Sequence, residues 1–343
     1  MPPGVSVDRF KTRATLIGLV ALGGFVMFAI APILLGQNST AALTKLFYLI
    51  TLATMWNLLA GYAGMVSVGQ QAYIGLGAYG VFVFNDLGLS PYLSALVASI
   101  AIGVIAFPIS FVAFRLKGGY FAIGTWIIAE AIRLIVIRIE PLGAGRGRSI
   151  SSYTADPIIR TNETYWLALG VVTVSLIVTF YLLRSRLGLG LQAIRDDDVA
   201  AQAMGVSVQR SKRIVFVVAA MGAGAAGGII CIQAIGVASP NQIFGVSYSA
   251  FMIFMVLIGG IGTIEGPIVG ALIYFAMDYY FSQLGLWYLV AIGLVAIIVT
   301  LFFPKGIWGE ISARFNFTLF PVGHRVIFPP DTPNLGLKDE YKH

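Results

Sequence analysis

The sequence predicts an all-α, polytopic membrane protein with about eight to ten transmembrane helices, some of them interrupted by glycine. Charge is scarce: the 343 residues are 58% hydrophobic and only 11% charged, whereas about a quarter of the residues of a soluble domain are charged. The apolar runs are long, and a helix needs about 20 mostly apolar residues to cross the bilayer core. These runs are continuous, without the alternation of a β-barrel strand, which favours helices.

Ten apolar segments are expected to span the membrane. In chain order they are 15–36, 42–60, 70–87, 92–114, 120–140, 164–184, 213–236, 247–260, 265–283 and 286–303. The eighth is short, and Gly259, Gly260 and Gly262 interrupt its end. An alternative is therefore eight or nine spans plus a re-entrant segment.

The placement of Lys and Arg predicts the orientation of the chain. If the N-terminus is cytoplasmic, only Arg146, Arg148 and Arg160 fall in outside segments, and the inside segments hold most of the other basic residues. By the positive-inside rule this predicts a cytoplasmic N-terminus (1–14), a transmembrane domain (15–303) with a cytoplasmic loop at 184–213, and a cytoplasmic tail (304–343). The net charge of +7 then needs no nucleic-acid partner. Several prolines in the tail predict an irregular conformation there.

The sequence argues against several kinds of site. Its single cysteine, Cys231, excludes an internal disulfide and a thiolate cluster, and its two histidines, His324 and His343, both lie in the tail. We therefore expect no metal, no cofactor and no catalytic cluster. The glycines of "GGIGTIEG" (259–266) lack the lysine of a nucleotide-binding loop, so the chain is not expected to bind ATP by itself.

The inner loop, residues 184–213, has the pattern of two short helices. Asp198 is a suitable N-cap, and Gly205 fits the position after a helix end, which predicts a helix at about 198–204. "LGLQAIR" predicts an earlier one. This loop is either an ordinary solvated connection or a docking element that inserts into a groove of a cytoplasmic partner. Its three aspartates, residues 196–198, are a weaker indication of a metal site, because no other ligand cluster supports it.

Glycine and amide residues interrupt the apolar sequence at "GYAGMVSVGQQAYIGLGAYG" (61–80). Irregular backbone at membrane depth is tolerated where it lines a cavity or is buried in protein, and such segments mark transport paths. Ser67, Gln70 and Gln71 would then face the path. The alternative is close helix packing, in which small residues let helices touch and amides bond across them.

Two charges lie inside the fifth predicted span. Glu130 and Arg133 are one turn apart and can neutralise each other. Intramembrane charges are costly and are often functional. The pair is therefore either a structural salt bridge or part of the path.

Four motifs in order resemble the permeases of branched-chain amino acid ABC transporters. They are "NLLAGYAGMVSVGQQAYIGLGAY" (57–79), "LKGGYFAIGTWIIAEAIRLI" (116–135), "SRLGLGLQAIRDDDVAAQAMG" (185–205) and "GGIGTIEGPIVGALIY" (259–274). The chain is similar to the larger of the two related permease subunits. It departs from the family pattern at Leu189, where arginine is usual, and in an outer loop with Arg146 and Arg148 in place of neutral glycines.

The resemblance implies an importer of branched-chain, hydrophobic amino acids in the inner membrane. Its implied partners are a second homologous permease, two cytoplasmic ATP-binding subunits, an extracytoplasmic substrate-binding protein and membrane lipid. Urea or short amides are the alternative substrates, and an ion-coupled secondary transporter is the alternative class. The residues expected to couple to the ATPases are Arg195, Asp196, Asp197, Asp198, Ala200, Ala201 and Gly205. The candidates for the path are Asn57, Gly64, Ser67, Gly69, Gln70, Gln71, Tyr79, Glu130 and Arg133.

Overall fold

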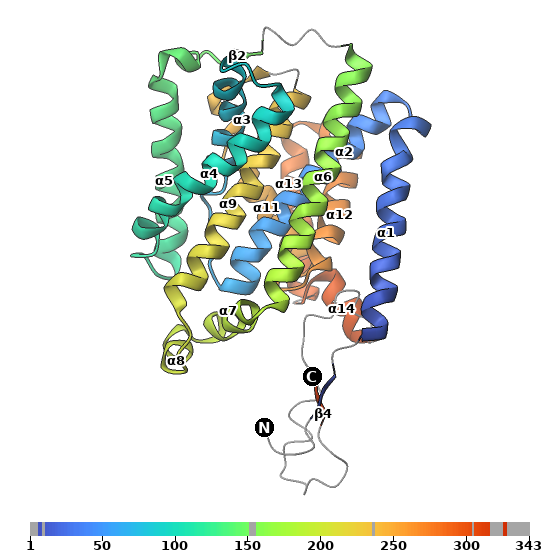
Figure 1. Ribbon diagram of the computed structural model, residues 1–343, viewed down its shortest axis with the longest axis vertical. Helices are drawn as coiled ribbons and strands as arrows, with labels where there is room; N and C mark the ends of the chain where they lie inside the picture. Colours follow the sequence, from blue (N-terminus) through green and yellow to red (C-terminus); the bar gives the residue numbers. More distant parts are fainter. Residues whose placement is uncertain are drawn as a thin grey trace, which may run out of the picture.

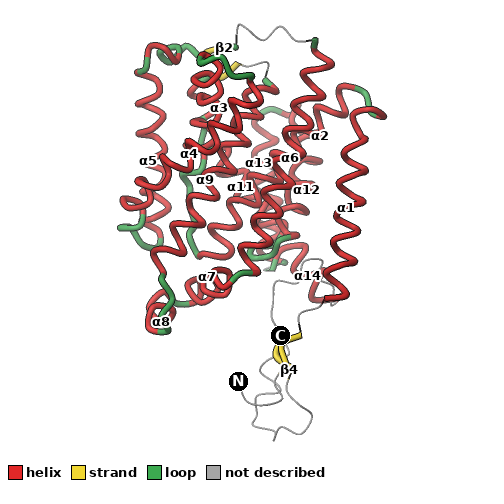
Figure 2. Tube along the Cα trace, viewed as in Figure 1, coloured by secondary structure: helices red, strands yellow, loops and turns green. Residues whose placement is uncertain are grey.

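The computed structural model describes residues 6–8, 11–150, 156–234, 237–303, 305–315 and 325–327. Within them the chain is almost entirely helical, and each of the ten predicted spans coincides with a helix (Figures 1 and 2). Seven helices of this part are long and apolar enough to cross a membrane. The prediction of an all-α, polytopic membrane protein is confirmed.

Successive helices run antiparallel to one another between the two ends of the bundle. The helices of the bundle are α1 (Lys11–Leu34), α2 (Gln37–Asn57), α3 (Gln71–Asp86), α4 (Pro91–Ala113), α5 (Gly119–Arg138), α6 (Pro157–Arg184), α9 (Val208–Gln233), α11 (Ser247–Gly259), α12 (Glu265–Phe281) and α13 (Leu286–Phe302). Figure 1 shows α7 (Arg186–Asp196), α8 (Asp198–Ala203) and α14 (Gly306–Phe315) at one end of this bundle. The opposite end carries β2 (Arg148–Ser149).

The remaining elements are short. They are the π-helix η1 (Leu58–Tyr62), the 3-10 helices η2 (Glu140–Leu142) and η3 (Ser282–Leu284), α10 (Pro240–Ile243) and four strands, β1 (Ser6–Asp8), β2, β3 (Val237–Ala238) and β4 (Arg325–Ile327). β1 pairs with β4 and β2 with β3, both antiparallel. The tail was expected to be irregular, and this is wrong for α14 and β4. The prolines of the tail lie either before the first residue of α14 (Pro304) or beyond its last one, so none of them interrupts the helix.

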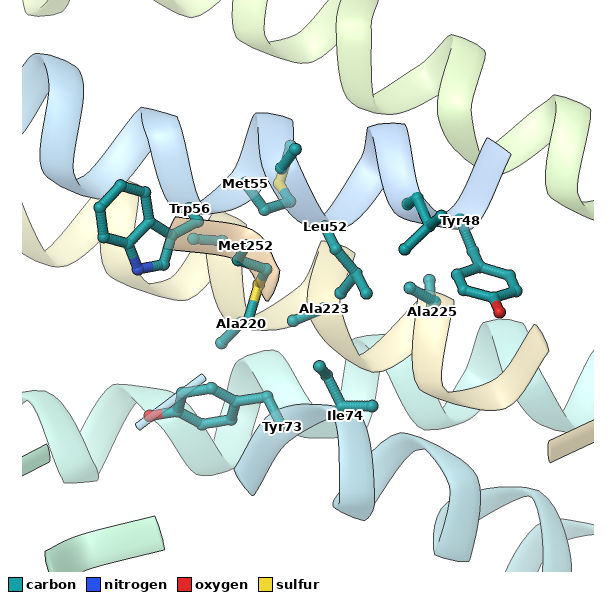
Figure 3. Packing of buried hydrophobic residues seen from close by; sticks show 14 of the residues in the cluster. Tyr48, Leu52, Met55, Trp56, Tyr73, Ile74, Ala220, Ala223, Ala225 and Met252 are labelled. Carbon is teal, nitrogen blue, oxygen red and sulfur yellow. The ribbon is translucent and has the colours of Figure 1, made fainter. Parts of the chain in front are cut away.

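Two helices form the centre of the bundle. α2 and α9 are largely buried, and α9 packs against α2, α3, α4 and α6. Small residues permit a close approach: a Cβ on Gly77 would overlap the Gly224 carbonyl oxygen, and one on Gly227 would overlap that of Ile74. Around these contacts Leu52, Met55 and Trp56 fill the interior (Figure 3). By contrast, α5 lies at the edge of the bundle and is mostly exposed.

Two helices are broken where the sequence contains glycine. After η1 the backbone of residues 64–70 is not helical, and α3 begins only at Gln71. At about 1.5 Å per residue, α3 is about 24 Å long, shorter than the bilayer core of about 30 Å. A second break separates α11 from α12, with positive φ angles at Gly260 (128°) and Gly262 (78°). The predicted glycine-interrupted helices are confirmed.

Candidate functional site

The segment between α6 and α9 forms two short helices that meet at Asp197. The Ser185 side chain caps α7 by accepting a hydrogen bond from the Leu187 amide (3.2 Å). Asp197 has an extended backbone, which ends α7, and its carboxylate accepts from the amides of Val199 (2.7 Å) and Ala200 (3.1 Å). The prediction that Asp198 caps the second helix is therefore wrong by one residue. α7 continues as far as Asp196, so Asp197 is the first residue free to satisfy the open amides of α8.

The three consecutive aspartates have three different environments. Asp198 is the first residue of α8, and its carboxylate forms an ion pair with the Lys212 ammonium at the start of α9 (2.6 Å). The Asp196 side chain is 72% exposed, and among the described residues its ion-pair partner is the neighbouring Arg195, at 3.4 Å. Asp197 thus caps α8, Asp198 ties it to α9, and Asp196 faces solvent.

Gly205 terminates α8, as predicted. Its φ is +85°, its amide donates to the Gln202 carbonyl (3.0 Å), and the Val206 amide donates to the Ala201 carbonyl (3.0 Å). This pair of bonds is a Schellman motif, for which glycine is the preferred residue. Ala201 is buried against the bundle. The exposed side of α8 and its C-cap carries Val199, Ala200, Gln202, Ala203 and Met204, of which Val199 and Met204 are 75% and 71% exposed.

Arg195 joins these helices to the first glycine break. Its Nη1 donates to the Gly61 carbonyl at the end of η1 (3.2 Å). Gly64, at φ +66°, faces the Arg195 backbone, and a Cβ there would lie 3.4 Å from the Arg195 Cα. The end of α7 is therefore in direct contact with the point at which the second span loses its helical form.

Asn57 joins the first glycine break to the second. Its amide nitrogen donates to the Thr263 carbonyl (2.7 Å), and its amide oxygen accepts from the Gly262 amide (2.9 Å). Asn57 is 1% exposed. The sequence indicated Gly61 and Gly262 only as glycines that interrupt the apolar spans, and it did not indicate Thr263. Contacts between segments 134 to 206 residues apart leave no local signal.

The irregular segment, residues 64–70, is fixed by bonds to two neighbouring helices. The Trp56 indole donates to the Ser67 carbonyl (2.8 Å), and the Val68 amide donates to the Thr125 hydroxyl of α5 (3.2 Å). A Cβ on Gly69 would overlap the Thr125 carbonyl oxygen. This close contact with α5 explains why glycine is required at position 69.

The two glutamines at the start of α3 differ. Gln71 accepts a hydrogen bond from the Ser249 hydroxyl of α11. Gln70 is 1% exposed, and within the described part of the chain neither atom of its amide has a hydrogen-bond partner. A buried amide without partners is costly, so this position has unused capacity to bind a polar group.

A cavity of about 490 Å³ opens between the irregular segment and the two loop helices. Its wall includes Gly64 and Val66 from the irregular segment, Lys117 and Phe121 at the base of α5, and the stretch from Ile194 to Asp198. The cavity thus lies at the α7–α8 end of the bundle and brings predicted coupling residues and a predicted path residue, Gly64, to one place.

The remaining path candidates lie elsewhere. The Tyr79 hydroxyl donates to the Ala238 carbonyl of β3 (3.2 Å) at the opposite end of the bundle, where the residue is buried. Glu130 and Arg133 form the expected ion pair on α5, with Arg133 Nε at 3.0 and 2.9 Å from the two carboxylate oxygens. Arg133 also donates to the Asn241 side chain of α10 (2.5 Å), a partner that the sequence did not indicate.

One of the two outer-loop arginines holds the loop in place. The Arg148 guanidinium donates to the Asp86 carboxylate (2.7 Å) and to the Pro141 carbonyl (3.0 Å), and it lies over the Phe82 ring. Arg146 is exposed. Arg148 therefore fixes the loop between α5 and α6 against the end of α3.

The chain is similar to known membrane transport proteins. Residues 38–301 match the family described as branched-chain amino acid transport system, permease component. Two relatives are high-affinity branched-chain amino acid transport system permease proteins LivM, from Escherichia coli K12 and Salmonella typhimurium LT2. Each is 25% identical, over 89% of this chain and 77% of the relative. A solved structure, PsaBC from Streptococcus pneumoniae in complex with Fab, is 15% identical over 75% of this chain and 95% of that one, with a TM-score of 0.39.

Proposed function

The chain belongs to the family of permease components of branched-chain amino acid transport systems, and from this premise we propose the following mechanism. The protein is the membrane-spanning subunit of an ABC importer that moves branched-chain, hydrophobic amino acids across the inner membrane. Separate ATPase subunits drive it. The observation that carries the proposal is the contact of the α7–α8 segment, through Arg195, with the glycine break at Gly61.

The α7–α8 segment is the docking element for the ATPases. α8 is short, capped at both ends and tied to α9 by the Asp198–Lys212 ion pair, so it can transmit a displacement without unfolding. Val199 and Met204 expose apolar side chains on its outer face, where an amphipathic helix fits into a groove of a partner. Arg195, Asp196, Asp197, Asp198, Ala200, Ala201 and Gly205 build or border this element.

Movement of the docking element reaches the path through two hydrogen-bonded links. Arg195 holds the carbonyl of Gly61, and Asn57 holds the loop at Gly262 and Thr263. Both glycine breaks would therefore shift together with α7. Such coupling requires an element with two states that both ends bias, and the non-helical backbone at 64–70 and 260–264 is that element.

The path runs along the irregular segment. Gly64, Ser67, Gly69, Gln70 and Gln71 lie on it, and the cavity beside Gly64 is its cytoplasmic mouth. Substrate would leave past Gln70, whose unpartnered amide can exchange hydrogen bonds with a passing polar group. Asn57 acts by holding the break in place, and Tyr79 by holding β3.

The complete transporter would contain a second homologous permease, two cytoplasmic ATP-binding subunits and an extracytoplasmic substrate-binding protein, within membrane lipid. Both termini of this chain are cytoplasmic in the proposal, because α1 begins and α14 lies on the side of α7 and α8 (Figure 1). This orientation follows from the basic residues that gather at this end, including Arg184, Arg186, Arg195, Arg210 and Lys212.

Uptake into vesicles tests the proposal. Vesicles with the four kinds of subunit receive labelled leucine and, in parallel, labelled urea, with and without ATP. Leucine uptake that requires ATP and the ATPase subunits is the expected result. The control is Gly205→Pro, since proline cannot adopt the φ of +85° that ends α8. Uptake without the ATPases would refute the ABC mechanism. ATP-driven urea uptake without leucine uptake would show that the substrate is urea and not a branched-chain amino acid.

A further inference from the structure

A polar cluster lies on the outward face of α5 at membrane depth. It consists of Glu130 and Arg133 of α5 and Asn241 of α10. At about 1.5 Å per residue, Glu130 and Arg133 lie about 16 and 21 Å along the helix from Gly119. Both positions fall inside a bilayer core about 30 Å thick, in the half nearer the β2–β3 end.

The described part of this chain does not enclose the cluster. The side chains of Glu130 and Arg133 are 46% and 21% exposed, and Asn241 is exposed as well. One turn away on the same face, Ile127 and Leu134 are 62% and 51% exposed. Charged residues in contact with hydrocarbon cost about 3 kcal/mol each even on the most lenient scale. This face of α5 therefore meets water or protein in the membrane, whereas a purely lipid-facing helix would be apolar.

The ion pair has unused hydrogen-bonding capacity. In the part of the chain that the structure describes, each Nη of Arg133 makes one bond, Nη1 to Asn241 and Nη2 to Glu130, and so each keeps one hydrogen. The Glu130 Oε2 accepts only from Arg133 Nε, whereas a carboxylate oxygen has two acceptor sites. A guanidinium edge and a carboxylate oxygen are thus both available without breaking the pair.

These free positions are complementary to the charged groups of an α-amino acid. A guanidinium binds a carboxylate through two parallel hydrogen bonds, and a carboxylate oxygen accepts from an ammonium. An apolar side chain held by both contacts would lie against Ile127 or Leu134. The same cluster would leave an uncharged amide or an alcohol with fewer partners, which gives selectivity.

We propose that Glu130, Arg133 and Asn241 form an outer binding site for the carboxylate and ammonium groups of the transported amino acid. Arg133 binds the carboxylate, Glu130 binds the ammonium, and Asn241 fixes the guanidinium. The site faces water on the exposed side of α5 and lies at the outer entrance to the path that runs along residues 64–70. This binding site rests on the proposed function, and it adds which groups of the substrate this chain recognises.

Cysteine labelling tests whether this face of α5 is accessible to water. Cys231 is buried, so a Cys231→Ala background carries single cysteines at Ile127 or Leu134, in the assembled transporter. The matched control is Val104→Cys on α4, which is 70% exposed at membrane depth without a charged neighbour in its helix. A charged, membrane-impermeant thiol reagent should modify positions 127 and 134 at least tenfold faster than position 104. Equal rates at all three positions would overturn the proposal.

Protection of the introduced cysteine from labelling tests which groups of the substrate the site recognises. Leucine should slow labelling at position 127 several-fold, whereas leucinol, without a carboxylate, and 4-methylpentanoate, without an ammonium, should not. Arg133→Gln should abolish the protection by leucine, and Asp278→Asn, in the Lys45–Asp278 ion pair, should retain it. Equal protection by all three compounds, or protection by leucine that survives Arg133→Gln, would overturn the proposal.

Uptake measured in the same vesicles distinguishes a failure of the binding site from a failure of the proposed function. If leucine is transported but position 127 is neither labelled nor protected, the binding site is wrong and the proposed function stands. If position 127 is labelled and protected by leucine but no ATP-driven leucine uptake occurs, the site stands and the proposed function is wrong.

Discussion

Alanine at Asp197 should loosen α8 more than alanine at either neighbouring aspartate. The Asp197 carboxylate accepts from two amides, at 2.7 and 3.1 Å, and loss of such a cap costs about 1 kcal/mol. Since 1.36 kcal/mol is a factor of ten, the open population of α8 should rise about fivefold. Asp198→Ala removes a partly exposed ion pair, worth at most about 1 kcal/mol. Asp196→Ala should have almost no effect, because that side chain faces solvent.

Hydrogen exchange at the amides of residues 199–203 measures this opening directly. We expect exchange to rise in the order Asp196→Ala, Asp198→Ala, Asp197→Ala. Asp197→Asn is the matched control, since asparagine caps helices as well as aspartate does, and it should exchange like the unchanged protein. In reconstituted vesicles the same order should appear as a falling ratio of leucine transported to ATP hydrolysed. Unchanged exchange in Asp197→Ala, or an equal effect of Asp196→Ala, would refute the assignment of the cap.

Three further predictions concern the bundle and its links. Gly77→Ala should lower the thermal stability of the purified protein by several degrees, because the new Cβ would overlap the Gly224 carbonyl oxygen, whereas Gly170→Ala, with open space around it, should not. Asn57→Ala removes two hydrogen bonds to the second glycine break. It should lower the free energy of unfolding, measured with denaturant, by about 1–3 kcal/mol. A change below about 0.5 kcal/mol would contradict the link between the two breaks. Arg195→Ala should keep ATP hydrolysis but lower leucine uptake at least fivefold, and unchanged uptake would show that the contact with the first break carries no coupling.

Much of the fold follows from local features of the sequence. Long apolar runs are enough to place ten helices of the bundle, since an unpaired backbone in lipid leaves helices as the simplest solution. The breaks at residues 64–70 and 260–264 coincide with glycine, and Gly205 ends α8 because few other residues adopt its φ. These predictions depend on neighbouring residues alone.

The site is harder to predict because its contacts join distant segments. Whether Asp197 or Asp198 caps α8 depends on where α7 ends, and three identical side chains in a row hide that boundary. The contact of Arg195 with Gly61 crosses 134 residues, and that of Arg133 with Asn241 crosses 108. Glu130 and Arg133 were predicted as a pair from their spacing, but their exposed position on α5 depends on which helices pack around it. Tyr79 was predicted as a path residue from its position in a motif, and that position gave no indication of its hydrogen bond to β3.

The central claim is that force from the ATPases enters this chain at α8. The most direct test places a photoreactive amino acid at Val199, which is 75% exposed on the outer face of α8, and at Ile158, 52% exposed at the other end of the bundle. In the assembled transporter, light should cross-link position 199 to an ATPase subunit, with a yield that changes when ATP is added, and position 158 should give no such product. Cross-links to the ATPase from other positions of the chain but none from Val199 would contradict the claim.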